Sequence, residues 1–302
     1  MLPKRGQGMP LPQFYQHLTL KHKTMSNQKV WFVTGASKGL GLSLVKQLLN
    51  NGYNVAATSR SVTDLENAVG KSESFLPLAV NITDEKSVND AISQTISLFG
   101  KIDVVVNNAG YGIIGALEEL SDAEARANFD VNVFGSLNVI RAAMPHLRRQ
   151  QSGHVFNISS IGGFSGNYPG FGIYCATKFA VQGFTESLAA EVKSFGIKAT
   201  IVSPGYFRTN FLAPDALSVP KNEIEDYKAV RDVQAAHQSD INGQQAGDPE
   251  KGVAAIITVA EAAEAPMHLF LGQDAYDLAY QKMNDVKQDL ETWKELTVNT
   301  GY

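Results

Sequence analysis

Short runs of β-branched and other apolar residues alternate along this chain with longer segments of helical periodicity. This alternation is typical of strand–helix–strand units, in which helices bury both faces of a parallel sheet. Because each crossover in such a sheet is right-handed, we expect a doubly wound α/β fold with its ligand crevice at the carboxyl ends of the strands. Six strands are expected at residues 30–34, 54–58, 75–80, 102–107, 154–158 and 198–203, and a seventh at 268–271.

The crossover helices carry recognisable start and stop signals. Gly52 and Gly100 follow two of the helical segments, and glycine is a common helix stop. A later helix is expected to begin with Asp248 as its N-cap and Pro249 at its first position. The polar segment 205–247 breaks the alternation, and we expect this insertion to form a lid over the crevice.

Composition limits the class of protein. The chain has 302 residues, is 44% hydrophobic and carries a net charge of −4, and no linker divides it, so we expect one domain over residues 30–302. A mildly acidic chain disfavours nucleic acid as a partner. The longest apolar run, residues 253–260, is too short to cross a membrane. With Cys175 as the only cysteine, no intrachain disulfide can form, and we expect a cytoplasmic protein.

The N-terminal segment has a different character. Its first 24 residues contain no Asp or Glu and show neither helical nor strand periodicity. They also lack the apolar core of a secretory signal and the composition of a transit peptide. We expect residues 1–29 to be a disordered extension, with Met25 as a candidate natural start.

Three glycines lie between the first expected strand and its helix: Gly35, Gly39 and Gly41. Glycines at this position let the backbone turn tightly and approach a pyrophosphate, which then meets the N–H groups at the start of the helix. A glycine-rich turn without a ligand is the alternative. The order of strand, turn and amphipathic helix favours the nucleotide.

The end of the second strand carries the signal for cofactor choice. An acidic residue there would bind the ribose hydroxyls of NAD, but this chain has Ser59 and Arg60. A guanidinium suits a 2′-phosphate, and Lys38 in the glycine loop adds a second positive charge. The sequence therefore favours NADP(H), whereas use of NAD would require both side chains to be solvated surface charges.

Tyr174 and Lys178 are four residues apart, so a helix places them on one face. A nearby ammonium favours the phenolate, and we expect it to lower the tyrosine pKa into a range useful for proton transfer. The same spacing arises by chance in many helices, so the pair needs further support from its surroundings. Cys175 falls off this face and is expected to be a buried packing residue.

Six motifs give that support, in the order TGASKGLG, NNAG, VNVFG, NISSIGG, YCATK and SPGYFRT. With them the chain resembles the short-chain dehydrogenases/reductases from about Val30 to Leu271, and is most similar to the hydroxysteroid dehydrogenase and carbonyl reductase branch. The resemblance implies a single Rossmann-type domain. It also implies an oxidoreductase that interconverts a carbonyl compound and an alcohol with NADP(H).

The resemblance implies a role for each residue of the expected catalytic set. Tyr174 would be the general acid or base, and Lys178 would lower its pKa and bind the nicotinamide ribose. Ser160 would bind the substrate oxygen, and is favoured over Ser159 for this role. Asn132 would hold a water molecule that relays protons to Lys178.

The expected cofactor contacts come from several motifs. They are Gly35, Ser37, Lys38, Gly39, Leu40, Gly41, Arg60, Asn81, Ile82, Asn108, Ala109, Gly110, Tyr174, Lys178, Pro204, Gly205 and Thr209. Asn81 departs from the family, which usually has an aspartate at this position.

Aromatic residues crowd the loops expected around the pocket, namely Phe164, Tyr168, Phe171, Tyr206, Phe207 and Phe211. They suggest a bulky, apolar carbonyl or alcohol substrate, and packing within the lid is an equally good explanation. No histidine or carboxylate cluster has metal-ligand spacing, so we expect no metal.

Two further expectations concern function and assembly. A non-catalytic protein that senses NADP(H) is an alternative, but such a protein would be expected to have lost Tyr174, Lys178 or Ser160, and all three are present. Family members commonly pair through helices that would span about 121–148 and 174–195 here. The resemblance therefore implies a homodimer or homotetramer.

Overall fold

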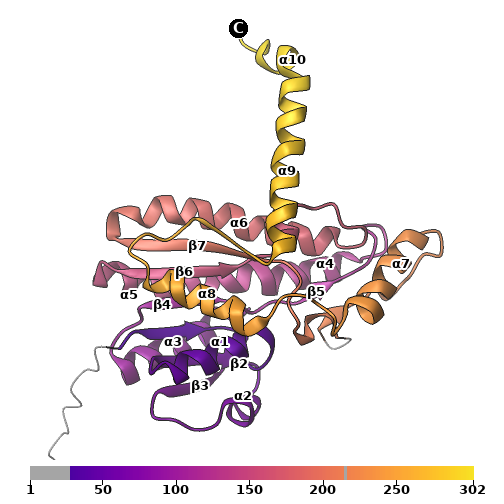
Figure 1. Cartoon of the computed structure of the whole chain (residues 1–302). Coiled ribbons are helices and arrows are strands. Elements are labelled where there is room, and N and C mark those ends of the chain that lie inside the picture. Colours follow the sequence, from indigo (N-terminus) through magenta and orange to yellow (C-terminus); the bar gives the residue numbers. More distant parts are fainter. Residues whose placement is uncertain (1–27, 214–215) are drawn as a thin grey trace, which may run out of the picture.

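The structure is a computed structural model, and it describes residues 28–213 and 216–302 (Figure 1). The predicted N-terminal extension, residues 1–29, lies outside the described residues except for its last two positions. Of these, Lys29 donates a hydrogen bond to the carbonyl of Ala260 at 3.0 Å and forms an ion pair with Glu261 at 2.8 Å. Lys29 therefore belongs to the folded body.

Seven parallel strands form the main sheet, in the order β3-β2-β1-β4-β6-β7-β9. The strands are β1 (Val30–Val33), β2 (Asn54–Ser59), β3 (Phe75–Ala79), β4 (Val104–Asn107), β6 (Gly153–Ile158), β7 (Ile197–Pro204) and β9 (His268–Leu271). This order is the doubly wound, Rossmann-like arrangement. The predicted fold class is confirmed, and the predicted strand ends differ from the observed ones by no more than two residues.

Helices cover both faces of the sheet because alternate residues of each strand point to opposite sides. In β1, Trp31 and Val33 pack against one layer of helices, whereas Phe32 packs against the other, and all are fully buried. The first layer holds α1 (Gly39–Asn50) and α8 (Pro249–Glu261), and the second holds α3 (Glu85–Phe99), α5 (Ser136–Gln150) and α6 (Gly172–Val192). The shorter α2 (Val62–Val69) follows β2.

The predicted helix signals have the expected geometry. Gly100 adopts a left-handed conformation after α3, with φ of 82°, and Gly52 has φ of 81° just beyond α1. The Asp248 side chain accepts a hydrogen bond from the N–H of Glu250 at 2.9 Å, with Pro249 beginning α8. This arrangement satisfies an N–H group that the helix itself leaves unpaired.

A π-helical stretch, Asp130–Gly135, joins α4 (Asp122–Phe129) to α5. Such stretches are rare and place one extra residue in a helical turn. Here the stretch carries Asn132, from the VNVFG motif. The predicted helix over 121–148 is therefore two α-helices with an irregular centre.

The segment 205–247 is anchored to the body by a buried ion pair. It contains β8 (Leu217–Ser218), which pairs with β5 (Gly112–Ile113), and the helix α7 (Lys228–Ala236). Glu119 contacts Arg231 of α7 at 2.5 Å and accepts the N–H of Ile224 at 2.8 Å. Burial raises the pKa of the Glu119 carboxyl, but its hydrogen bonds and the Arg231 charge outweigh burial and lower it overall. The carboxylate thus ties the segment to the loop after β5.

The C-terminal helix α9 (Gln273–Thr292) projects away from the body and is followed by the short α10 (Lys294–Val298) (Figure 1). The sequence motifs predicted no element here. Ala275 and Ala279, near the start of α9, are buried and pack with Ile161. Among the helices of the described residues, none has both the length and the hydropathy needed to span a bilayer.

Candidate active site

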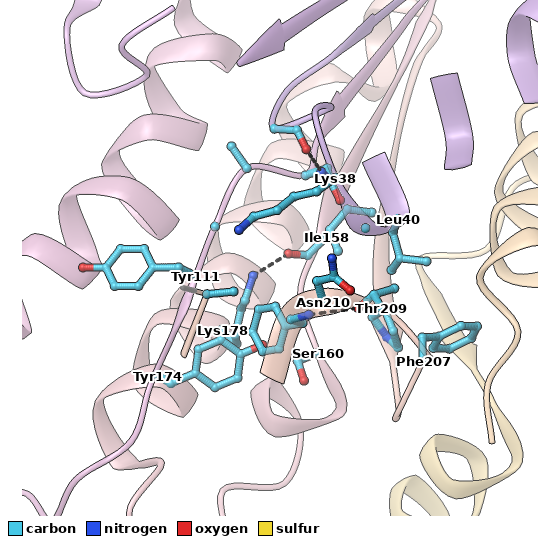
Figure 2. Close-up of a pocket in the computed structure, with 18 of the residues that line it drawn as sticks. Lys38, Leu40, Tyr111, Ile158, Ser160, Tyr174, Lys178, Phe207, Thr209 and Asn210 are labelled. Atoms are coloured by element: carbon cyan, nitrogen blue, oxygen red, sulfur yellow. Dashed lines mark hydrogen bonds between the residues drawn. The ribbon is translucent and has the colours of Figure 1, made fainter. Parts of the chain in front are cut away.

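A cavity of about 680 Å³ lies at the carboxyl ends of the central strands (Figure 2). Its walls come from the loops after β1, β2, β3, β4, β6 and β7 and from the start of α6. All predicted site residues line it except Gly41 and Asn132. The structure therefore brings the glycine loop and the Tyr174–Lys178 pair together in one cavity.

The glycine loop after β1 is held by a hydrogen-bond network. Gly35 has φ of 66°, and a Cβ atom added there would lie 2.6 Å from Cα of Ala109. The side-chain amide of Asn108 donates to the carbonyls of Thr34 and Gly35, both at 2.9 Å. The close backbone approach excludes any larger residue at Gly35 without a shift of the loop.

The start of α1 suits an anionic group. Lys38 is its N-cap, and the Lys38 side chain makes no capping hydrogen bond, which leaves N–H groups of the first turn suited to an anionic ligand. Gly41, which was predicted to contact the cofactor, does not line the cavity. A Cβ atom at Gly41 would lie 2.5 Å from both the Asn108 amide nitrogen and the Gly35 carbonyl oxygen, so this glycine is needed for packing within the loop.

Positive and polar side chains line the cavity beyond the glycine loop. Arg60 is exposed at the end of β2 and has no ion-pair partner among the described residues. Lys38 is also exposed and lines the same cavity. The Asn81 side-chain oxygen accepts hydrogen bonds from the N–H of Thr83 at 3.2 Å and from its hydroxyl at 2.9 Å. Arg60 and Lys38 make this part of the wall electropositive, which suits a phosphate ester.

Tyr174 and Lys178 lie one turn apart on α6, and both are buried (Figure 2). The Lys178 ammonium lies 5.8 Å from the centroid of the Tyr174 ring. It donates a hydrogen bond to the carbonyl of Ile158, at the end of β6, at 2.9 Å. Burial lowers the pKa of Lys178 to about 8, because the buried ammonium loses its hydration.

The pKa of Tyr174 differs from the expectation. Burial raises it above the ordinary value for tyrosine, while a hydrogen bond with Ser160 acts in the opposite direction. The rings of Phe171 and Phe211 lie 6.1 Å and 5.8 Å from the Tyr174 ring, centroid to centroid. The expected lowering by Lys178 is not found in this structure, since desolvation in this aromatic surrounding is the largest influence on the phenol.

The two candidate serines have different surroundings. Ser159 is buried and donates a hydrogen bond to the carbonyl of Lys178 at 3.0 Å. Ser160 accepts the N–H of Gly162 at 3.1 Å, and its hydroxyl also hydrogen-bonds with Tyr174. Ser160 is therefore the serine placed beside the phenol, which agrees with the preference drawn from the sequence.

Asn132 lies outside the cavity, whereas a residue that binds a relay water was expected to face it. It is 1% exposed and does not line the cavity. Its side-chain oxygen accepts the N–H of Tyr111 at 3.0 Å, and its amide donates to the Tyr111 carbonyl at 3.1 Å and to Thr177 at 3.0 Å. The hydroxyl of Thr177 in turn donates to the Tyr174 carbonyl at 2.7 Å. These contacts fix the loop after β4 against α6, and the predicted water relay stays a prediction.

Five of the six aromatic residues expected around the pocket line the cavity. Phe164 does not, because it packs against Phe270 with a centroid distance of 5.2 Å. The sequence motifs missed His237, which lines the cavity and shares a hydrogen bond of 2.9 Å with the Tyr206 hydroxyl. No local pattern marks His237, since it lies in the polar segment and reaches the cavity only through the tertiary fold.

Comparison with known proteins shows which family the chain resembles. The family model for short chain dehydrogenases matches residues 29–217, which is more than half of the chain. The oxidoreductase BOA17 of Botryotinia fuckeliana is 38% identical over 89% of this chain and 98% of its own length. A 3-ketodihydrosphingosine reductase of Bacteroides thetaiotaomicron is 37% identical over 81% of this chain and 88% of its own length.

Two solved structures extend the comparison to three dimensions. A short-chain dehydrogenase from Streptomyces avermitilis superposes with a TM-score of 0.83 and 35% identity, covering 90% of this chain and all of that chain. ElxO with NADP bound has a TM-score of 0.67 and 27% identity, covering 81% of this chain and 97% of that one.

Fold, cavity and relatives together define an oxidoreductase of the Rossmann type. More narrowly, the chain belongs to the short-chain dehydrogenase family.

Proposed function

We propose that this protein is an NADP(H)-dependent oxidoreductase that interconverts a carbonyl compound and an alcohol. The observation that carries the proposal is the convergence of Tyr174, Ser160 and Lys178 on the cavity that also holds the glycine loop. A sensor without catalytic activity would have no need for a serine hydroxyl beside a buried phenol. The protein ElxO, with NADP bound in its structure, supports the choice of cofactor.

The residues present fit a dinucleotide. The close approach at Gly35 and the uncapped start of α1 suit the pyrophosphate. Arg60 and Lys38 suit the 2′-phosphate that distinguishes NADP from NAD, and the buried Lys178 suits the nicotinamide ribose. When bound, the nicotinamide supplies or accepts the hydride.

The remaining chemistry is that of the protein's own side chains. In the direction of carbonyl reduction, the Tyr174 hydroxyl donates its proton to the substrate oxygen, and the Ser160 hydroxyl hydrogen-bonds the same oxygen. The pKa of Tyr174 is raised, so the phenol keeps its proton at neutral pH, which is the form that reduction needs. In alcohol oxidation the same group takes the proton back.

We further propose that the substrate is bulky and largely apolar. Aromatic side chains line the cavity beside Tyr174, among them Phe171 and Phe211, and the segment 205–247 acts as a lid that contributes Phe211 and His237 to its wall. The relative that is named a 3-ketodihydrosphingosine reductase agrees with such a substrate. The hydroxysteroid dehydrogenase and carbonyl reductase branch, the cytoplasmic location and assembly through α4–α5 and α6 stay predictions.

The test of the catalytic role is Tyr174→Phe, with Tyr53→Phe, remote from the cavity, as the matched control. Turnover of a panel of apolar ketones with NADPH is followed by absorbance, and NADPH binding is measured by fluorescence. We expect Tyr174→Phe to lose nearly all turnover and to keep NADPH binding. Retained turnover would remove Tyr174 from the mechanism, whereas tight NADPH binding without turnover in the unmodified protein would favour the sensor.

The cofactor proposal has its own test in Arg60→Leu. We expect the unmodified protein to bind NADPH more tightly than NADH, and the variant to lose at least about tenfold of that preference, since a charged hydrogen bond contributes about 1.5–3 kcal/mol. Equal affinity for both cofactors in the unmodified protein would favour the NAD-dependent alternative.

A further inference from the structure

Helix α9 projects from the body (Figure 1). It carries a row of large apolar side chains that the body of the protein leaves exposed. Tyr276, Met283, Val286, Leu290 and Trp293 are each between 42% and 60% exposed. A soluble protein seldom exposes a continuous apolar surface of this length without a partner for it.

The spacing of these residues is that of a coiled-coil seam. Positions 276, 283 and 290 are seven apart, and so are 279, 286 and 293, which together form one apolar stripe along the helix. The start of the stripe packs against the body of the same chain, where Ala279 is buried. Farther along, the same side of the helix remains apolar although its side chains are exposed.

The stripe also borders a groove of about 520 Å³ on the body. Met283, Val286 and Leu290 form one wall, and Phe179 and Gly183 of α6 belong to the other. A Cβ atom at Gly183 would meet nothing within 4 Å, and Phe179 is 43% exposed. The groove is thus a mainly apolar corner that is open to a further helix, and it is also lined by Gln182, Glu186, Lys282 and Lys287.

We propose that the stripe binds the same helix of a second copy of this chain, with the two α9 helices antiparallel about a two-fold axis. Such an axis places the same edge of the two stripes side by side, with the two helices running in opposite directions. On one edge, Lys282 then lies opposite Asp289 of the second copy, and the contact occurs twice. On the other edge, Lys287 meets Tyr280 of the second copy, where an ammonium and an aromatic face attract each other.

Charge argues against a membrane as the occupant. Residues 273–302 contain six acidic side chains and three lysines, so the helix and its tail are net negative. Helices that lie on anionic membranes instead carry Lys and Arg along their polar face. A second copy offers both the matching apolar stripe and the matching charges.

The first experiment measures molar mass in solution by light scattering. The double variant Val286→Glu/Leu290→Glu is expected to halve the mass of the unmodified protein, with NADPH binding retained. Gln288→Glu, on the opposite side of the same helix, is the control and is expected to change nothing. A monomeric unmodified protein, or an unchanged mass in the double variant, would overturn the proposal.

The second experiment tests the antiparallel register. Lys282→Cys/Asp289→Cys is expected to form disulfide-linked dimers on oxidation. The two positions are about 10 Å apart along one helix, which is too far for a disulfide within one chain. Gln281→Cys/Gln288→Cys is the matched control on the polar side and is expected to stay unlinked. Equal cross-linking in both variants would refute the register.

Charge reversal and vesicles complete the test. Lys282→Asp alone is expected to weaken the dimer by about tenfold or less, because exposed ion pairs contribute little. Adding Asp289→Lys in the same chain is expected to restore the dimer. Without restoration, the Lys282–Asp289 contact is wrong. Co-sedimentation with neutral or anionic phospholipid vesicles, abolished by Leu290→Glu without any change in mass, would show a membrane surface as the occupant and would overturn the proposal.

Discussion

Lys178 allows the electrostatics of the candidate site to be measured without any substrate. Its ammonium is buried, and burial lowers its pKa from 10.5 to about 8. Below pH 8 the lysine is charged in both the folded and the unfolded chain, so folding pays the full cost of burying the charge. Between pH 8 and 10.5 the unfolded chain holds a proton that the folded chain has released. Stability contributed by this group therefore rises with pH in that window.

The magnitude follows from the difference in pKa. At about 1.4 kcal/mol for each pKa unit, the rise amounts to about 3 kcal/mol between pH 7.5 and pH 10.5. Lys178→Met keeps the length of the side chain and removes the charge. The variant also leaves the Ile158 carbonyl without its hydrogen bond, which costs about 1–3 kcal/mol, but that loss does not depend on pH.

The assay is urea unfolding of both proteins at pH 7.5, 9 and 10.5, followed by tryptophan fluorescence. The quantity of interest is the difference in unfolding free energy between Lys178→Met and the unmodified protein. We expect this difference to shift by about 3 kcal/mol in favour of the unmodified protein as the pH rises. Lys46→Met, at an exposed position on α1, is the control and should show no such shift. A difference that stays constant with pH would refute the reasoning.

Two other predictions concern the fold and the loop. Burial, with the charges of two nearby lysines, lowers the pKa of His154 from 6.5 to about 3. As the pH falls, the unfolded chain therefore binds a proton at a higher pH than the folded chain does, and stability is lost between pH 6.5 and 3. We expect His154→Gln to make Tm fall less steeply between pH 7 and pH 4. Gly35→Ala should weaken NADPH binding at least about tenfold in a titration, because its Cβ would collide with Ala109, whereas the open site at Gly183→Ala should leave binding unchanged.

Much of the fold can be predicted from local sequence patterns. The seven strands were predictable because parallel strands buried on both faces are continuous apolar runs, and all four residues of β1 are buried. Tyr174, Lys178 and the glycine loop were predictable because their spacing within one helix or turn already determines their geometry. The role of Gly41 could not be predicted from spacing alone, since only the structure shows that Asn108 packs where a Cβ atom would be.

The remaining features depend on contacts between distant parts of the chain. The raised pKa of Tyr174 reflects burial beside residues such as Phe211, which is 37 positions away in a polar segment without a regular pattern. Arg231 and Glu119, which anchor that segment, are 112 residues apart, and no local spacing links them. Asn132 was identified from its motif, but its contacts with Tyr111 and Thr177 need the tertiary fold.

Cys175, the residue next to Tyr174, can serve as a chemical probe of access to the candidate site. It is the chain's only cysteine, it is 4% exposed, and burial raises its pKa to about 11. Thiol reagents attack the thiolate, and Cys175 lines the cavity, so labelling depends on how often this buried sulfur becomes accessible from the cavity. The labelling rate of this single sulfur therefore measures access to the candidate site, and slower labelling in the presence of NADPH would show that the cofactor restricts that access.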